Sequence, residues 1–294
     1  MAEAGTIGWI VSYPKSGNTW LRLMLLSLMR GGLAVDINRA GTEAGLASHF
    51  ELDELLVVES GELFRAEQIA VQPALNKAIA TETGAGLKLR KVHDCYWRTP
   101  SGEAVFPASV SRGAVYIVRD PRDVAVSFAH HRGTSIENII ATLADPAATL
   151  SAADDRYRRQ LAQPLGDWSS HIRSWLDQPD IPVRLVHYED LLTDPERELR
   201  AVADHLGIPH DPRSLKAAVA ATRFDALQAQ EQAHGFTERQ VGSTAPFFRQ
   251  GVAGGWRRDL TEAQAARILA DHGAQMRNLG YTGDTGDTGD TGGA

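Results

Sequence analysis

Short apolar segments separated by long amphipathic stretches set the pattern of this 294-residue chain. Residues 7–11 are apolar on both faces, which predicts a fully buried strand. Residues 86–93, 114–118 and 181–187 predict three further strands. Because helical stretches separate these strands, the pattern indicates an α/β fold with one parallel sheet flanked by helices.

The stretches between the strands predict the helices. Residues 18–29 are apolar nearly all round, which is typical of a buried helix. Another helix is expected to begin after Asp120, because Asp caps a helix start and Pro121 suits the first helical position. The remaining helices are expected over residues 167–176, 195–206, 212–221 and 261–278.

Three regions carry weaker patterns. Residues 33–84 are expected to form a partly helical surface region, a candidate lid over the substrate, and residues 133–165 a loop with a helix. Residues 282–294 repeat Thr-Gly-Asp without an apolar face to bury, so this tail is expected to be disordered and without a catalytic role. No linker interrupts residues 1–281, which are therefore expected to form one domain.

Composition narrows the range of partners. A formal net charge of −7 argues against nucleic acid, because proteins that bind it need a basic face. The single cysteine, Cys95, allows no intramolecular disulfide and fits a reducing compartment. The first residues lack the basic segment of a signal peptide, and the apolar run 21–29 is too short to span a bilayer. We therefore expect a cytoplasmic protein that binds neither nucleic acid nor membrane.

The loop between the first strand and its helix concentrates anion-binding chemistry. It reads Tyr-Pro-Lys-Ser-Gly-Asn-Thr-Trp over residues 13–20. The N–H groups and dipole of a helix start attract anions, Gly17 lets an anion approach the backbone, and Lys15 adds a mobile positive charge. In the ordinary nucleotide-triphosphate loop the Lys follows a second Gly, whereas Lys15 precedes the only Gly here. The alternative is a helix start that the two hydroxyls merely cap.

This motif resembles the 5′-phosphosulfate loop of the sulfotransferases that use 3′-phosphoadenosine 5′-phosphosulfate (PAPS) and release PAP. The resemblance implies a sulfotransferase fold of the P-loop nucleoside-triphosphate-hydrolase type. It implies transfer of a sulfonate group to a hydroxyl, or less often an amine, without a metal ion. Lys15 would stabilise the charge on the leaving phosphate oxygen. The loop residues that it implies in cofactor binding are Lys15, Ser16, Gly17, Asn18, Thr19 and Trp20.

A Lys and a His share one face at the end of the second predicted strand. Side chains alternate along a strand, so Lys91 and His93 point the same way, toward the carboxyl edge where ligands lie in parallel sheets. A nearby cation favours neutral imidazole, which makes His93 a candidate general base. The segment Lys-Val-His resembles the Lys-Thr-His of the family, which implies that His93 is the catalytic base and that Lys91 contacts the sulfonate. The other histidines considered, His130, His131 and His187, are expected to be structural or solvated.

Two segments are candidates for holding the 3′-phosphate. Arg119 ends the third strand and Ser127 lies two turns into the next helix, a spacing that resembles the 3′-phosphate site of the family. The alternative is a plain strand–helix junction in which Arg119 pairs with Asp123. Residues 247–256 resemble the glycine-rich segment that folds over the same phosphate, and they add Arg249, Gln250 and Gly251. Gln250 and Gly255 depart from the Lys and Asp of the family, so either cofactor binding is weaker or Arg257 compensates.

Weaker resemblances suggest the adenine site and leave the acceptor open. Tyr188, Thr222 and Phe224 match positions near adenine in the family, and Trp20 and Phe224 are expected to stack on the base. The alternative is that Tyr188 and Phe224 are plain core residues. An apolar or aromatic small-molecule acceptor is favoured by the aromatic residues of 33–75, 94–112 and 130–165. These are Phe50, Phe64, Tyr96, Trp97, Phe106 and Tyr157. The basic cluster at 156–159 is expected to be a solvated helix face.

Two other functions stay open at this point. A magnesium-dependent nucleotide kinase would need a Lys after the second loop Gly and a strand-end Asp for the metal, and neither is obvious. A non-catalytic nucleotide-binding protein would keep the anion loop without the chemistry, but the Lys91 and His93 pair argues against it.

Overall fold

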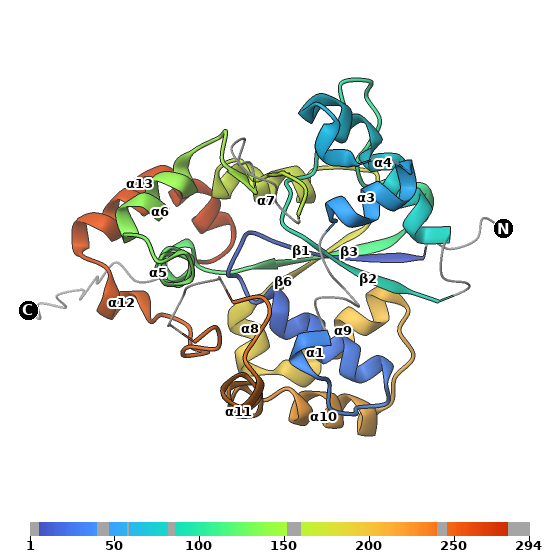
Figure 1. Cartoon of the computed structure of the whole chain (residues 1–294). Helices are drawn as coiled ribbons and strands as arrows, with labels where there is room; N and C mark the ends of the chain where they lie inside the picture. Colours follow the sequence, from blue (N-terminus) through green and yellow to red (C-terminus); the bar gives the residue numbers. More distant parts are fainter. Residues whose placement is uncertain are drawn as a thin grey trace, which may run out of the picture.

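The computed structural model describes residues 6–39, 47–57, 59–81, 86–151, 160–239 and 246–281. Four parallel strands form the central sheet in the order β2-β1-β3-β6 (Figure 1). They are β1 (Ile7–Ser12), β2 (Lys88–Val92), β3 (Ser111–Val118) and β6 (Val183–His187). The predicted α/β fold with a parallel sheet is therefore confirmed, because each segment predicted as a strand forms one of these four strands.

One face of the sheet is covered by the helix that follows β1. This helix, α1 (Asn18–Met29), is buried along almost its whole length, as its apolar sequence predicts. It packs against α9 (Pro195–Leu206) and α10 (Pro212–Ala221), and Figure 1 shows these helices together on one side of the strands. The same side carries α8 (Tyr188–Thr193) and α11 (Phe224–His234). Neither α8 nor α11 was expected from the sequence.

The opposite face buries the larger aromatic core. It is covered by α3 (His49–Leu56), α4 (Arg65–Thr81) and α7 (Trp168–Leu176), and further along by α5 (Pro121–Arg132), α6 (Ile136–Ala144) and α13 (Glu262–Asn278). The side chains of Leu52, Leu75 and Ile79, from α3 and α4, are almost fully buried in this core. The outer faces of these helices are exposed, with Phe50 67% exposed, so the predicted partly helical surface region agrees with the structure, and a lid over the substrate stays a prediction.

Shorter elements connect the helices. They are η1 (Ile37–Arg39), η2 (Ser60–Glu62), η3 (Ala108–Val110), α12 (Trp256–Asp259) and the antiparallel pair β4 (Thr149–Leu150) and β5 (Gln163–Pro164). The tail 282–294 and the cluster 156–159 lie outside the described residues. Among the helices that are described, none is both long and apolar enough to cross a bilayer.

The sheet places its crevice beside β1. After β1 the chain forms β2 on one side of β1, and it then forms β3 on the other side of β1. Ligands of parallel α/β sheets bind where the strand order reverses in this way, at the carboxyl ends of the strands. The loops after β1 and β3 therefore meet at the expected ligand position.

Candidate active site

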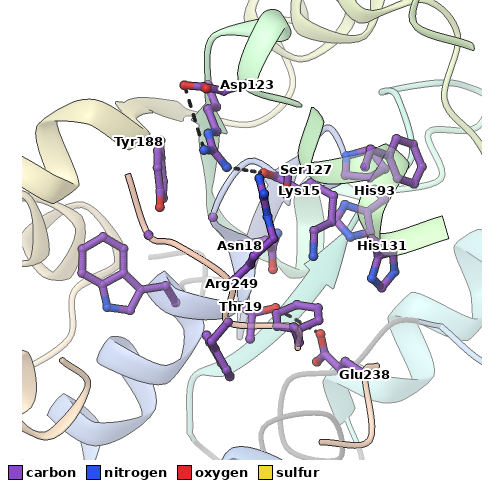
Figure 2. A pocket seen from close by; sticks show the side chains of 18 of the residues that line it. Lys15, Asn18, Thr19, His93, Asp123, Ser127, His131, Tyr188, Glu238 and Arg249 are labelled. Carbon is purple, nitrogen blue, oxygen red and sulfur yellow. Dashed lines mark hydrogen bonds and ion pairs between the residues drawn. The ribbon is translucent and has the colours of Figure 1, made fainter. Parts of the chain in front are cut away.

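A cavity of about 670 Å³ opens at the carboxyl ends of the strands. Figure 2 shows Lys15, His93 and His131 on one side of this cavity and Tyr188 on the other. Most of the site residues predicted from the sequence line it. They are Lys15, Gly17, Asn18, Thr19, Trp20, Lys91, His93, Arg119, Ser127, Tyr188, Phe224, Arg249, Gln250 and Gly251.

Two predicted cofactor residues do not line the cavity. Ser16 is buried within the loop, and its Oγ has no hydrogen-bond partner in the described part of the chain. The hydroxyl of Thr222 donates to the carbonyl of Ala218 at 2.8 Å, back inside α10. The Thr222 hydroxyl therefore faces away from the cavity, and cofactor binding by Thr222 stays a prediction. Thr222 acts instead through its carbonyl, which accepts the Trp20 indole N–H at 2.9 Å and holds that ring at the cavity wall.

The loop after β1 keeps its shape through unusual backbone angles and one pinned amide. Lys15 and Gly17 both have positive φ, at 69° and 103°. A Cβ on Gly17 would lie 2.6 Å from the Tyr188 ring, so glycine is needed there for close approach as well as for backbone freedom. The Asn18 amide donates to the carbonyl of Ile10 at 2.8 Å and to the Ser12 hydroxyl at 3.3 Å. Asn18 thus fixes the loop onto the end of β1.

The Lys15 ammonium group rests on an aromatic ring. Its Nζ lies 3.7 Å from the centre of the Phe247 ring, a cation–π contact. Burial, and then the positive charge of Lys91, lowers the pKa of Lys15 to about 7. Phe247 belongs to the glycine-rich segment, residues 247–256, yet nothing in the local sequence indicated that its ring would contact Lys15.

His93 is held as a neutral ring in one tautomer. Its Nδ1 lies 2.7 Å from the carbonyl oxygen of Ser12, and because a carbonyl only accepts, Nδ1 must carry the proton. Nε2 therefore keeps its lone pair. Burial, and then the charge of Lys91, lowers the pKa of His93 well below its ordinary value of 6.5. The carbonyl of His93 accepts from Nε2 of His171 at 2.9 Å, which secures the strand end beneath it.

A second histidine lines the cavity, contrary to expectation. His131, on α5, contacts the Phe247 ring edge-on at a centroid distance of 5.8 Å. Burial, and then the charges of Lys15 and Lys91, lowers its pKa to about 3, so the ring is neutral. The expected structural role agrees with its packing on Phe247, but its place at the cavity wall was not predicted, because that place depends on packing rather than on a local motif.

Glu238 is a second lining residue that the sequence analysis missed. Its carboxylate accepts from Lys91 Nζ at 3.0 Å and from the Thr19 hydroxyl at 3.1 Å (Figure 2 draws the Thr19 bond). The guanidinium of Arg22 donates to the same carboxylate at 2.5 Å. Burial alone would raise the pKa of Glu238, but Lys91 and Arg22 together lower it well below its ordinary range.

Arg119 links three walls of the cavity. Its guanidinium donates to the carbonyls of Lys15 at 3.2 Å and Val252 at 2.9 Å, and lies 4.3 Å from the centre of the Tyr188 ring. The alternative pairing with Asp123 is present at a distance of 4.0 Å. Arg119 Nε is buried and has no hydrogen-bond partner among the described residues. A guanidinium in this position can bind an additional anion.

The glycine-rich segment is held by Asp123 rather than by an acid of its own. The carboxylate of Asp123 accepts from the backbone N–H of Gly254 at 2.7 Å and of Trp256 at 2.9 Å. Asp123 was expected to matter only as a partner of Arg119. These two bonds fix the turn that follows Arg249 and Gly251.

The arginine that contacts Gln250 is not Arg257, which was expected to compensate for the missing lysine. The side-chain oxygen of Gln250 accepts from Arg258 at 3.2 Å. Arg257 instead lies over the Trp256 ring, with its Cζ 4.6 Å from the ring centre. Arg258, rather than Arg257, is therefore the cation next to Gln250.

The aromatic residues expected around the acceptor do not line this cavity. Phe50 and Phe64 are 67% and 79% exposed, and Tyr96 and Phe106 pack against Trp175 in the core. Trp97 is likewise not a lining residue, and Tyr157 lies outside the described residues. The apolar part of the wall is formed instead by Val126, Phe128, Leu150, Leu192 and Leu227.

The arrangement suits a doubly phosphorylated nucleotide. Two buried donors, Ser16 Oγ and Arg119 Nε, have no hydrogen-bond partner within the described ranges. Cations lie at both ends, with Lys15 and Lys91 by His93 and with Arg119 and Arg249 by the glycine-rich segment. Aromatic side chains of Trp20, Tyr188 and Phe224 line the same cavity. Within the described residues, no cluster of His, Cys, Asp and Glu could hold a metal ion.

Known proteins are similar to this chain along most of its length. A family model for the sulfotransferase domain matches residues 7–280. The chain is 23% identical to sulfotransferase 1B1 of Mus musculus over 272 residues, which is 91% of this chain and 81% of the relative. It is 25% identical to sulfotransferase 1A1 of Rattus norvegicus over 271 residues, with coverage of 91% and 83%.

Solved structures share the fold. Retinol dehydratase in complex with androsterone and the inactive cofactor PAP matches with a TM-score of 0.61 and 17% identity, covering 93% of this chain and 81% of that chain. A mouse sulfotransferase complexed with PAP matches with a TM-score of 0.58 and 20% identity, covering 94% and 85%.

Proposed function

The chain belongs to the sulfotransferase family, and on this premise we propose that it transfers the sulfonate group of PAPS to a hydroxyl of a small molecule, with His93 as the general base. The observation that carries this proposal is the neutral ring of His93, its Nδ1 engaged by Ser12, in the same cavity as Lys15 and Lys91. An amine is the less favoured acceptor group.

The two phosphate positions are proposed from the distribution of cations. Lys15 and the backbone of residues 16–19 would hold the 5′-phosphosulfate at the helix start. Arg119, Ser127 and Arg249 would hold the 3′-phosphate, which distinguishes PAPS from simple adenine nucleotides. The adenine ring would lie among Trp20, Tyr188 and Phe224, whose faces can stack on a base.

His93 would take the proton from the acceptor hydroxyl through Nε2. PAPS supplies the sulfonate group and a phosphate as leaving group. Lys15 would stabilise the negative charge on the phosphate oxygen, and Lys91 would hold the sulfonate oxygens. An anion held by these two lysines also offsets their effect on His93 and so favours its protonated form. Positioning and charge neutralisation are expected to contribute most of the rate, as in phosphoryl transfer.

A small apolar alcohol is the acceptor class that we favour. The apolar wall formed by Val126, Phe128 and Leu150 lies in the same cavity as His93 and supports this choice. Solved neighbours carry androsterone in one case and retinol in another. A cytoplasmic location, a domain ending at residue 281 and a disordered tail remain predictions.

The test is a transfer assay with labelled PAPS and a panel of phenols, alcohols, amines and sugars. We expect acceptor-dependent sulfonation, and a turnover at least about a hundredfold lower for His93→Ala with PAP binding retained, the usual scale for a lost acid–base group. Turnover near that of the wild type would remove His93 from the mechanism. Magnesium-dependent phosphate transfer from ATP would favour a kinase, and PAP binding without PAPS consumption would favour a non-catalytic binding protein.

A further inference from the structure

Glu238 occupies donors that the proposed reaction assigns to PAPS. We propose that its carboxylate competes with the phosphosulfate group of PAPS, with the sulfonate for Lys91 and with the 5′-phosphate for Thr19, and thereby sets the preference of this enzyme between PAPS and its product PAP. This inference rests on the proposed function, because it concerns the same cation site. It gives Glu238 a role in donor specificity, which the reaction itself does not require.

The carboxylate lies in a built anion site. One oxygen, Oε2, accepts from both Lys91 Nζ and the Thr19 hydroxyl, whereas Oε1 accepts from Arg22. The three donors come from the start of α1 and the end of β2, and the Glu238 side chain is only 16% exposed. A carboxylate is planar and a sulfonate is tetrahedral, but both are oxyanions that accept hydrogen bonds from the same donors.

The residues just before Glu238 are fastened to the rest of the fold. The backbone N–H of Thr237 donates to Asn38 at 2.8 Å, and the Asn38 amide donates to the carbonyl of Gly235 at 3.2 Å. Phe236 is buried against Phe247, with ring centroids 4.8 Å apart. The carboxylate is therefore delivered to Lys91 by packing and backbone bonds, and not by a chance surface contact.

Simultaneous occupancy is unfavourable for two reasons. The Thr19 hydroxyl has a single proton, so it cannot donate to Glu238 and to a bound anion at once. A sulfonate at Lys91 would also lie next to the Glu238 carboxylate, and like charges placed together repel. Binding of PAPS therefore requires that Oε2 of Glu238 gives up Thr19, and the repulsion favours its departure from Lys91.

Glu238 can make this exchange without losing its own charge partner. Oε1 can stay on Arg22 at 2.5 Å while Oε2 turns away from Lys91 and Thr19. Arg22 is fully buried and is held by the Asn18 side chain at 3.0 Å, so it offers a fixed anchor. The exchange costs one ion pair and one hydrogen bond, and the bound phosphosulfate makes replacements for both.

The competition distinguishes the donor from the product. Lys91 lies two residues before His93, on the side where the sulfonate must meet the base and the acceptor. PAP lacks the sulfonate, so it leaves the Glu238–Lys91 pair intact and competes only at Thr19. The presence of Glu238 should therefore weaken PAPS binding more than PAP binding.

Calorimetric titration of PAPS and of PAP, without acceptor, tests the inference on the wild type, Glu238→Gln and Glu238→Asp. We expect Glu238→Gln to bind PAPS about tenfold more tightly, the size of one hydrogen bond to a charged group. PAP affinity should change by less than about threefold on the same scale. Glu238→Asp keeps the charge but is shorter, so it should give a smaller change in the same direction.

A matched control removes the same charge elsewhere. Glu51 pairs with Arg90, the neighbour of Lys91 on β2, and does not line the large cavity. Glu51→Gln should leave both affinities unchanged, and Gln at this third helical position preserves the capping interaction.

Four results separate the possibilities. Weaker PAPS binding by Glu238→Gln would mean that Glu238 keeps Lys91 charged, and equal changes for PAPS and PAP would mean that it does not discriminate; either overturns the inference. Should Glu238→Gln fail to fold, a lack of PAPS tightening in Glu238→Asp would overturn it as well. A wild-type protein that binds neither PAPS nor PAP would instead contradict the proposed function.

Discussion

Lys15 and His93 show that surroundings, rather than residue type, set the charge in this site. Both side chains lie in one cavity next to Lys91, and burial lowers the pKa of each. For His93 this secures the neutral form that a base needs. For Lys15 burial brings the pKa close to neutral pH, so the positive charge that binds an anion depends on the pH.

PAP binding should therefore weaken as the pH rises above 7. Lys15 loses its proton through a pKa of about 7 in the free protein, whereas a bound anion favours the charged form. The affinity should fall by up to about tenfold per pH unit between pH 7 and 9, the limit for one linked proton. Calorimetry at pH 8, in buffers of different ionisation enthalpy, should detect uptake of close to one proton.

Two variants assign this effect to Lys15. Lys15→Met should bind PAP weakly and without proton uptake. Lys77→Met removes an exposed lysine, paired with Glu103, and should behave as the wild type. Affinity that stays constant from pH 7 to 9 in the wild type would contradict the assignment.

The residue scale also shows where sequence reasoning reaches its limit. Lys15, Lys91 and His93 could be predicted because a local motif and the alternation of a strand specify them. Glu238 and Asp123 could not, because each acts on a partner more than a hundred residues away, Lys91 for the first and Gly254 for the second. No local pattern records such a pairing.

At the scale of elements, glycines allow the loops of the site to lie directly against aromatic side chains of the cavity wall. Gly17 lies against Tyr188, and Gly251, with a φ of 62°, lies against Phe224. A Cβ on Gly251 would stand 2.6 Å from the Phe224 ring, so the ring would have to move. The glycine-rich loop and the start of α11 thus form one wall.

Gly251→Ala should weaken PAP binding by about tenfold, because a displaced Phe224 no longer stacks on adenine. A tenfold change corresponds to about 1.4 kcal/mol. The matched control is Gly102→Ala, which has a φ of 86° and no atom within 4 Å of the added Cβ. Both variants should lose about 1 kcal/mol of stability from backbone strain. Equal PAP affinities for the two variants, measured by titration, would refute a role for this contact.

The elements that escaped prediction have physical reasons in common. Each of the four sheet strands lies within or over a predicted segment, although β2, with the sequence Lys-Leu-Arg-Lys-Val, is not apolar. Helix α4 contains Pro73 and buries few apolar residues, and α11 buries only Leu227 and Glu231, so neither shows a clear apolar stripe. Tertiary packing on the sheet and on the cavity holds these helices, and a single sequence does not display that packing.

At the scale of the molecule, the end of α13 is tied back to the edge of the site. The carbonyl of Tyr281 accepts from Arg122 at 2.8 Å, and its hydroxyl donates to Glu189 at 3.0 Å. Arg122 also binds Asp120, which caps α5, and Glu189 accepts the Asp120 backbone N–H at 3.3 Å. Tyr281 therefore joins the last helix to the starts of α5 and α8.

Truncation at two neighbouring positions tests whether the folded unit ends at Tyr281. A chain ending at Tyr281 should match the full chain in Tm and turnover, because residues 282–294 have no apolar face to bury. A chain ending at Gly280 loses the hydrogen bonds to Arg122 and Glu189, each contributing about 1.5–3 kcal/mol. Its Tm should fall by several degrees, at about 2–4 °C per kcal/mol for a domain of this size. A lower Tm for the chain ending at Tyr281 would show that the tail stabilises the domain, and the boundary would then have to be moved.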